Sequence, residues 1–195
     1  LFGGLKLEKF KDHPLWSDLP SVIHLPQSDM IGWLDQIYAW MIDELSSRSL
    51  GYHSAVSRLG ELVIIQAIRT YVVREQSKSG GWIGALHDSR LIKVLNLIHS
   101  RLEEPWTLDS LAAEVGMSRS RLVGHFVNHV GEAPMHYVAR WRIYRAARLL
   151  RETELNISNV VRAVGYESEP SFSNAFKKIH GVPPGRYRRA MRDER

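Results

Sequence analysis

The sequence predicts a mainly α-helical protein whose last part consists of two helix-turn-helix units joined by a long helix. One pattern, a short apolar helix followed by a glycine turn and a serine-led second helix, occurs at 108–134 and again at 157–184. Between the two copies, apolar residues keep a helical spacing without interruption. Ahead of them, two further helical patterns predict a hairpin, preceded by the remnant of a β domain.

The two copies of the repeat align residue by residue around their turns. Val115-Gly116 corresponds to Val164-Gly165, and the second copy then has one additional turn residue. The later correspondences are Ser118 with Ser168, Leu122 with Phe172, Phe126 with Phe176, Gly131 with Gly181, and Pro134 with Pro184. In a helix-turn-helix of this form, the second helix fits the major groove of DNA. Two copies on one chain therefore predict a protein that reads two groove segments.

Local signals set the bounds of the C-terminal helices. Side chains of the Ser, Thr and Asn type before an apolar pattern predict helix starts, and a glycine after it predicts the end. The expected helices are 89–103, 108–115, 119–130, 134–153, 157–164, 169–180 and one that begins near Pro184. The spacer, 134–153, would be roughly 28 Å long at about 1.5 Å per residue. Recognition helices that read one face of B-DNA lie about 34 Å apart, so with the flanking turns the two lengths agree.

The N-terminal part is organised differently. Residues 1–28, in which Leu5–Glu8 alternates like a strand, are expected to be the trailing edge of a β domain, and the chain to be part of a longer protein. Residues 29–76 predict a helical hairpin with more apolar surface than a hairpin can bury alone. That surface would pack against the β domain, form a subunit interface, or do both. The Ser- and Gly-rich residues 77–89 are the expected linker to the DNA-binding domain, 90–195.

Composition and charge narrow the function. The chain of 195 residues has no cysteine and a formal net charge of +5, which excludes disulfides and thiolate chemistry. Its apolar runs are shorter than the roughly 20 residues of a membrane span. Residues 1–89 have a net charge of −2, from 8 basic and 10 acidic side chains. Residues 90–195 have a net charge of +7, from 18 basic and 11 acidic side chains. The positive charge thus accompanies the repeats, where a polyanion would bind.

The exposed stripe of each second helix is the candidate DNA-reading surface. Leu122 and Phe126 lie four residues apart and predict a buried stripe, as do Phe172 and Phe176, so the opposite stripe is free for base edges. The candidate base-reading residues are Arg119, Ser120, Arg121, Val123, Gly124, Glu169, Pro170, Ser173 and Asn174. The candidate phosphate contacts are Ser118, Arg140, Arg142, Ser168, Lys177 and Lys178.

Other site chemistries are poorly supported. His125 and His129 have the i, i+4 spacing of some zinc sites, but no cysteine or inward carboxylate completes a coordination shell, so neither a metal nor a cofactor is expected. Paired carboxylates, a motif-borne Ser/His/Asp grouping and a phosphate loop are not found, so an enzyme is not expected either. The alternative function is a helical protein-interaction or dimerisation module that does not bind DNA.

The segment VRAVGYESEPSFSNAFKKIHGVPPGRYRR, together with LAAEVGMSRSRLVGHF and WRIYRAARLLRET, resembles the DNA-binding domain of AraC/XylS transcriptional regulators. The match covers about 90–190, and residues 1–75 more weakly resemble the end of a cupin sensor domain with its helical hairpin. The hallmark residues are Gly165-Tyr166, Phe172, Phe176, Lys177, Gly181, Pro183-Pro184 and Tyr187-Arg188.

This resemblance implies a cytoplasmic, nucleoid-associated bacterial regulator that activates or represses transcription. It implies double-stranded promoter DNA as the partner, a homodimer formed through 29–76, RNA polymerase as a further candidate partner, and a small-molecule or stress signal sensed by the cupin domain. Two positions depart from the family. Gly124 stands where relatives commonly carry a long Arg or Gln, and Asn174 stands where they often carry Arg. Because Asn can pair bidentately with adenine, base preference is expected to differ from that of relatives.

Overall fold

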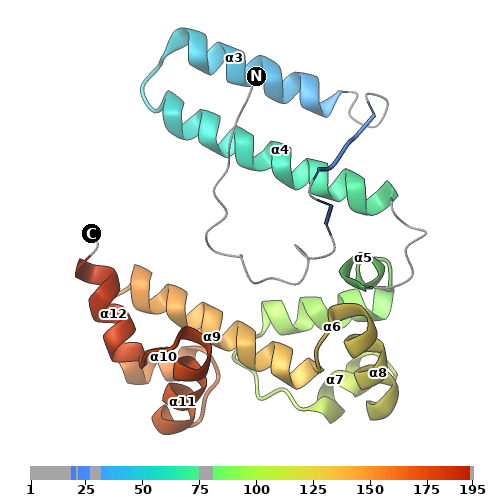
Figure 1. Ribbon diagram of the computed structural model, residues 1–195, viewed down its shortest axis with the longest axis vertical. Coiled ribbons are helices and arrows are strands. Elements are labelled where there is room, and N and C mark those ends of the chain that lie inside the picture. The colour runs from blue at the N-terminus through green and yellow to red at the C-terminus, as the bar shows by residue number, and fades with distance from the viewer. Residues whose placement is uncertain (1–18, 21, 27–31, 75–80, 194–195) are drawn as a thin grey trace. The chain divides into compact units, whose positions relative to one another are not determined.

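The computed structural model describes residues 19–20, 22–26, 32–74 and 81–193 (Figure 1). The chain divides into two compact units, Leu1–His87 and Asp88–Arg195. The described residues are mainly helical and contain no strand. The strand expected at Leu5–Glu8 lies outside the described residues.

The first unit contains a helical hairpin and a short third helix. Helices α3 (Trp33–Ser47) and α4 (Tyr52–Arg74) pack against each other as the sequence predicts. The segment 77–89 differs in part from the expected linker, because Gly81–Ala85 form the short helix α5. The side chains of Trp82 and Ile83 within α5 are buried. Their apolar surface outweighs the linker-like glycines around them.

The second unit is a series of helices arranged around one long central helix. Its helices are α6 (Ser89–Ser100), α7 (Leu108–Glu114), α8 (Arg119–Val130), α9 (Pro134–Glu152), α10 (Ile157–Ala163), α11 (Glu169–His180) and α12 (Pro184–Asp193). Helix α9 contacts α8 as well as α10, α11 and α12. Figure 1 shows α9 running from the α6–α8 group to the α10–α12 group. One helix therefore carries both helix-turn-helix units.

Polar side chains cap the helix starts in both helix-turn-helix units, as expected. Thr107 forms a reciprocal capping box with Ser110 at the start of α7. At the start of α10, Asn156 Oδ1 accepts from the backbone amide of Asn159 at 2.8 Å. Because such caps satisfy amides that lack an intrahelical partner, each is worth about 1 kcal/mol. The caps thus fix where each short helix begins.

The buried residues form a core beneath each helix-turn-helix unit. The core of the first helix-turn-helix unit includes the fully buried residues Leu91, Ile98, Leu111, Leu122, Phe126 and Tyr137. The second core consists of Ile143, Ala146, Ala147, Leu150, Val160, Val161, Val164, Phe172 and Phe176. Both cores include residues of α9, so the long helix is part of both units rather than an exposed linker.

Candidate nucleic-acid interface

Helix α8 buries one stripe and exposes the other near its N-terminus. Leu122 and Phe126 are 0% exposed, which anchors the helix on the first core. The Ser118 hydroxyl accepts from the backbone amide of Arg121 at 3.4 Å, and this bond caps the helix. Among the predicted base-reading residues of this helix, Arg119, Ser120, Arg121 and Gly124 are exposed and Val123 is half-buried. These side chains are available to a ligand that approaches the start of α8.

Helix α11 repeats this arrangement with different chemistry. Phe172 and Phe176 are 0% exposed, and the Ser168 hydroxyl accepts from the backbone amide of Ser171 at 3.4 Å. Glu169, Pro170 and Asn174 are exposed, whereas Ser173 is half-buried. The two candidate recognition helices therefore present equivalent positions but unlike side chains.

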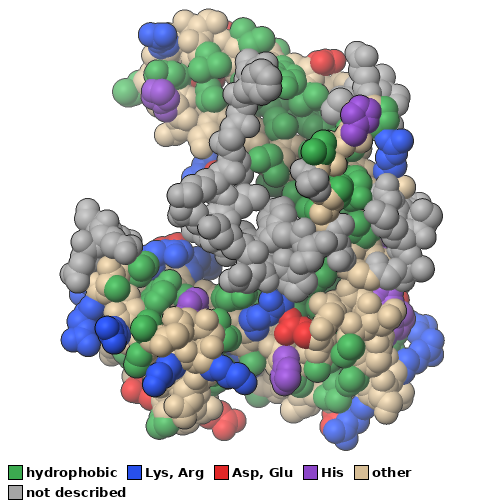
Figure 2. Space-filling view, in the orientation of Figure 1, with side chains coloured by type: hydrophobic (Ala, Val, Ile, Leu, Met, Phe, Trp, Pro, Cys, Tyr) green, Lys and Arg blue, Asp and Glu red, His purple; other side chains and the backbone are tan. Residues whose placement is uncertain are grey.

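Charge differs between the two candidate recognition surfaces. The start of α8 carries Arg119 and Arg121, and Arg119 Nε lies 3.2 Å from Asp109 Oδ1 in a pair that is largely exposed. Exposed pairs of this kind contribute little stability, so Arg119 can exchange Asp109 for a phosphate or base at small cost. The start of α11 carries Glu169 instead, and its basic residues Lys177 and Lys178 lie in the last turn, exposed. Figure 2 shows Lys and Arg side chains spread over the face of the second unit that it displays.

The guanidinium groups of Arg140 and Arg142, two of the predicted phosphate contacts, are engaged with other residues of Asp88–Arg195. The Arg140 side chain is 18% exposed and pairs with Glu132. Arg142 donates to the backbone carbonyl oxygens of Leu102, at 3.0 Å from Nε, and of Glu104. Both arginines take part in holding the fold together, and their role as phosphate contacts stays a prediction.

The structure adds basic candidates that the sequence did not single out. Arg162 on α10 and Arg186 and Arg189 on α12 are exposed, and a phosphate backbone is contacted by side chains of this type. Their neighbour Arg188 is different, since it donates to the carbonyl oxygen of Leu155. The i, i+3 spacing of Arg186 and Arg189 was the signal in the sequence, because it places both on one side of a helix.

The histidine pair of α8 does not assemble a metal site. His125 Nε2 lies 3.1 Å from Asp88 Oδ2, whereas the opposite ring nitrogen, Nδ1, lies 3.3 Å from His129 Nδ1. Because the two contacts leave from opposite sides of one imidazole, the three groups do not converge on a single point. The described residues contain no group of three or more His, Asp or Glu side chains that could hold a metal ion.

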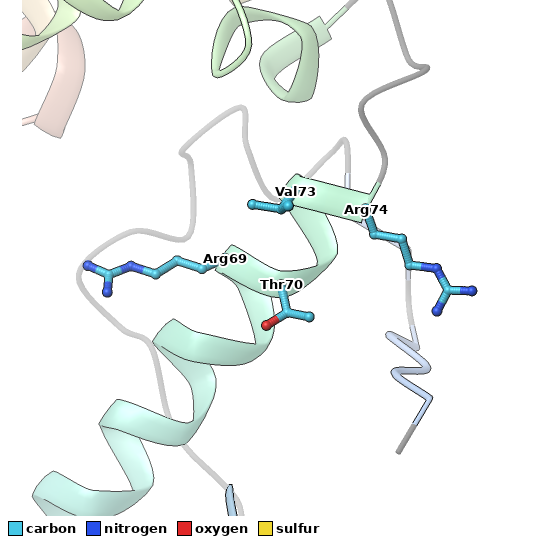
Figure 3. Close-up of a pocket in the computed structure, with 4 residues that line it drawn as sticks. All are labelled: Arg69, Thr70, Val73 and Arg74. Atoms are coloured by element: carbon cyan, nitrogen blue, oxygen red, sulfur yellow. The ribbon is translucent and has the colours of Figure 1, made fainter. Parts of the chain in front are cut away.

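A hollow on the first unit is lined by Arg69, Thr70, Val73 and Arg74 at the end of α4 (Figure 3). All four residues belong to the same helix, and the two arginine side chains point in opposite directions in Figure 3. A small-molecule site needs polar groups that converge on the ligand. The described part of this hollow does not provide them.

The length of α9 is comparable to the spacing of consecutive major-groove segments. The helix has 19 residues, which corresponds to about 28 Å. Helix α8 precedes it and α11 follows it after one short helix, and α9 contacts both. Consecutive major-groove segments on one face of B-DNA are about 34 Å apart. The arrangement therefore suits a duplex read at two adjacent segments.

Two domain families match the sequence, one in each unit. A helix-turn-helix domain matches residues 111–190, and a cupin domain matches residues 1–73. The first match contains both candidate recognition helices, and the second contains the helical hairpin up to residue 73. Among the described residues, no helix is both long and apolar enough to cross a bilayer.

Solved structures with this arrangement of helices include a DNA-binding domain bound to its target DNA. The DNA-binding domain of AdpA, a global transcriptional factor solved in complex with a target DNA, is 28% identical with a TM-score of 0.54, over 55% of this chain and 97% of that domain. The C-terminal domain of AraT, a response regulator from Geobacillus stearothermophilus, is 32% identical with a TM-score of 0.52, over 53% and 86%. The second unit thus has the fold of an AraC-type DNA-binding domain.

Similarity to AraC-like regulators extends over nearly the whole chain. An AraC-like transcription regulator of Streptomyces lividans is 32% identical over 188 residues, which are 96% of this chain and 62% of that protein. The transcriptional regulator AlkR of Acinetobacter baylyi is 34% identical over 179 residues, 90% of this chain and 58% of AlkR. The chain is thus similar to AraC-like regulators in both units, which confirms the resemblance, and it spans about three fifths of the length of these relatives.

Proposed function

We propose that this protein is a transcriptional regulator that binds promoter DNA sequence-specifically and reads two adjacent major-groove segments. The observation that carries the proposal is a pair of serine-capped helices, α8 and α11, whose polar N-terminal positions are exposed at the two ends of one 19-residue helix. The similarity to the AdpA domain, which was solved with its target DNA, supports the same conclusion.

Within this proposal, the residues divide by role. The base edges are read by Arg119, Ser120, Arg121, Val123, Gly124, Glu169, Pro170, Ser173 and Asn174. Lys177 and Lys178, with the exposed arginines of α10 and α12, hold the phosphate backbone, and Ser118 and Ser168 present the capped helix starts to it. Base contacts then set the sequence preference, and phosphate contacts set most of the affinity.

The partners of the complete protein extend this proposal. The hairpin of α3 and α4 exposes apolar side chains, with Trp40 55% and Ile42 54% exposed, and a homodimer through 29–76 would cover such surface. Light scattering of this chain at micromolar concentration tests the dimer, and a monomer would count against it. The cupin match supports a signal-sensing role for the first unit, RNA polymerase is a candidate partner, and the bacterial nucleoid is the proposed site of action.

A salt titration separates this function from a helical interaction module that does not bind DNA. Binding of the 195-residue chain to a fluorescent promoter duplex is followed by anisotropy between about 50 and 200 mM salt. We expect the logarithm of the association constant to fall linearly with the logarithm of salt concentration, because bound basic residues release counterions from DNA.

The variant Lys177→Gln/Lys178→Gln should reduce the steepness of this salt dependence by roughly 2, because each lost phosphate contact removes about one unit of slope. The matched control, Arg58→Gln/Arg69→Gln, removes two exposed charges from α4 in the first unit and should leave the slope unchanged. Absence of DNA binding across this salt range would favour the interaction module instead.

A further inference from the structure

The segment Arg101–Trp106, which connects α6 to α7, also contacts the second helix-turn-helix unit. We propose that this segment, here called the brace, fixes the angle and separation of the recognition helices α8 and α11. Arg142 and Gly165 are then positioning residues for two-segment DNA binding rather than DNA contacts. The inference rests on the proposed function and names residues outside the predicted base-reading surface.

Gly165 brings the turn of the second helix-turn-helix unit directly against the backbone of the brace. A methyl group added to Gly165 would lie 2.4 Å from the carbonyl oxygen of Glu103 and 2.9 Å from its Cα atom. The corresponding glycine of the first helix-turn-helix unit, Gly116, has the same left-handed conformation, with a φ of 63° against 76° for Gly165. A methyl group added to Gly116 would meet no heavy atom within 4 Å. The close approach therefore belongs to the second copy and is not a general requirement of the turn.

Arg142 joins the brace to the core of the second helix-turn-helix unit. Its Nε lies 3.0 Å from the carbonyl oxygen of Leu102, and its terminal nitrogen donates to that of Glu104. The guanidinium carbon also lies 6.0 Å from the ring centroid of Tyr166. Burial lowers the pKa of Arg142 and raises the pKa of Tyr166, which is consistent with a contact partly withdrawn from water.

Tyr166 carries this connection to the recognition helix. Its ring packs edge-on against Phe172 of α11, with the centroids 5.5 Å apart, and Phe172 is 0% exposed. A displacement of the brace would therefore move the side chains that anchor α11. The ion pair between Arg145 and Glu103, with 2.9 Å between its nitrogen and oxygen atoms, lies at the edge of the same contact. Because this pair is exposed, it contributes little to stability.

The brace is itself ordered by local contacts and leads directly into the first helix-turn-helix unit. Trp106 is 8% exposed, and its Nε1 donates to the carbonyl oxygen of Arg101 at 2.7 Å. Leu102 is 4% exposed, and the next residue after the brace is Thr107, which caps α7. The two helix-turn-helix units are thus connected twice, once through α9 and once through the brace. Two connections restrict rotation and bending of one unit against the other more than a single helix does.

A fixed geometry matters because two linked binding modules gain affinity only when both can engage at once. The gain over a single module is on the order of 10²–10⁴ and is lost when the geometry does not match the two sites. Loosening the brace should therefore weaken binding to a duplex with both segments. It should leave binding to a duplex with one segment nearly unchanged.

The test uses the 195-residue chain and three kinds of duplex. The first is a duplex of about 30 bp recovered by selection with the wild-type protein, spanning two segments about one helical turn apart. The second has the α11-read segment scrambled, and the third has short insertions between the segments. The variant Arg142→Lys keeps the positive charge but loses the planar two-donor fork. We expect it to lose about tenfold in affinity for the first duplex and less than about twofold for the second.

Arg142→Lys should also tolerate insertions between the segments better than the wild type does, because its two units are held less rigidly. A variant that is only less stable would not show this tolerance. Gly165→Ala should reduce the preference for two segments more than its matched control Gly116→Ala, which introduces the same side chain at the same kind of φ. If Gly165→Ala does not fold, as judged by circular dichroism, Arg142→Lys carries the test alone.

Equal losses on the one-segment and two-segment duplexes would overturn the brace, because they would make Arg142 an ordinary contact or a general stabiliser. Unchanged affinity of Arg142→Lys for every duplex would also overturn it. A wild-type protein that binds none of the duplexes would refute the proposed function itself, and this outcome is distinguishable from both of the others.

Discussion

At the scale of single residues, Asn174 is the side chain of α11 best suited to read a base. It is exposed one turn before Lys178, and an Asn side chain can donate to and accept from one adenine. Asn174→Ala should relax the preference at one base pair by about 1–3 kcal/mol while changing affinity for other sequences little. Competition binding against duplexes substituted at each position measures this. A uniform loss on all sequences would reduce Asn174 to a backbone contact.

The control for this variant is Asn128→Ala, which makes the same change at an exposed position near the end of α8. Recognition helices contact bases mainly through their N-terminal residues. We therefore expect Asn128→Ala to retain the wild-type preference at every base pair.

Gly124 offers a second prediction at this scale, with an effect on stability. It lies inside α8 with a negative φ, and a methyl group there would meet no heavy atom within 4 Å. Gly124→Ala should therefore stabilise the domain by about 0.5–1 kcal/mol, since glycine is unfavourable within a helix. Thermal unfolding of the variant without DNA would show a higher Tm than that of the wild type. A lower Tm would mean that the position has a packing constraint absent from the structure.

The residues that the sequence predicts well are those whose partners are near in the chain. The roles of Ser118 and Ser168 as caps follow from amides three residues later. The position of Arg142 on the spacer predicts a phosphate contact, but its acceptors in the structure lie 40 and 38 residues away in the chain. A helical pattern contains no information about such partners, so the structural role of Arg142 was not predictable.

At the scale of the element, α11 depends on its two buried phenylalanines. Phe176 is 0% exposed and packs 5.6 Å from Phe172 and 5.3 Å from Tyr187 between ring centroids. Phe176→Ala should cost about 3–5 kcal/mol of unfolding free energy, because it leaves a cavity in the second core. Chemical denaturation measures the loss, and unchanged stability would contradict the core assignment.

Ile179→Ala is the matched change in the same helix, since Ile179 is 39% exposed. Substitutions at exposed positions of this kind usually alter stability by less than about 0.5 kcal/mol. A large effect at Ile179 with none at Phe176 would mean that α11 packs with its other face inward.

Elements were predictable where caps, apolar spacing and turns agree. Helices α8 and α11 occupy the ranges expected from Ser118 and Ser168 and from the glycines that follow. Helix α5 was not expected, because Gly80-Gly81 are typical of a linker and the burial of Trp82 and Ile83 depends on tertiary packing. Local composition therefore predicts elements reliably only where it and tertiary burial favour the same structure.

At the scale of the whole DNA-binding unit, the function depends on how far apart α8 and α11 are held. Helix α9 supplies the distance, and its residues take part in both cores. The sequence predicts this spacing from the length of 134–153 alone. It does not predict the second connection between the units, because the approach of Glu103 to Gly165 joins parts of the chain that are distant in sequence.

The central claim is that both recognition helices enter one duplex from the same side in consecutive major-groove segments. Selection of bound sequences from a random DNA pool by the 195-residue protein tests this most directly, since it reports the number of recognised blocks and their separation. We expect two preferred blocks whose centres lie about 10–10.5 bp apart. A single block, or two blocks on opposite faces of the helix about 5 bp apart, would contradict it.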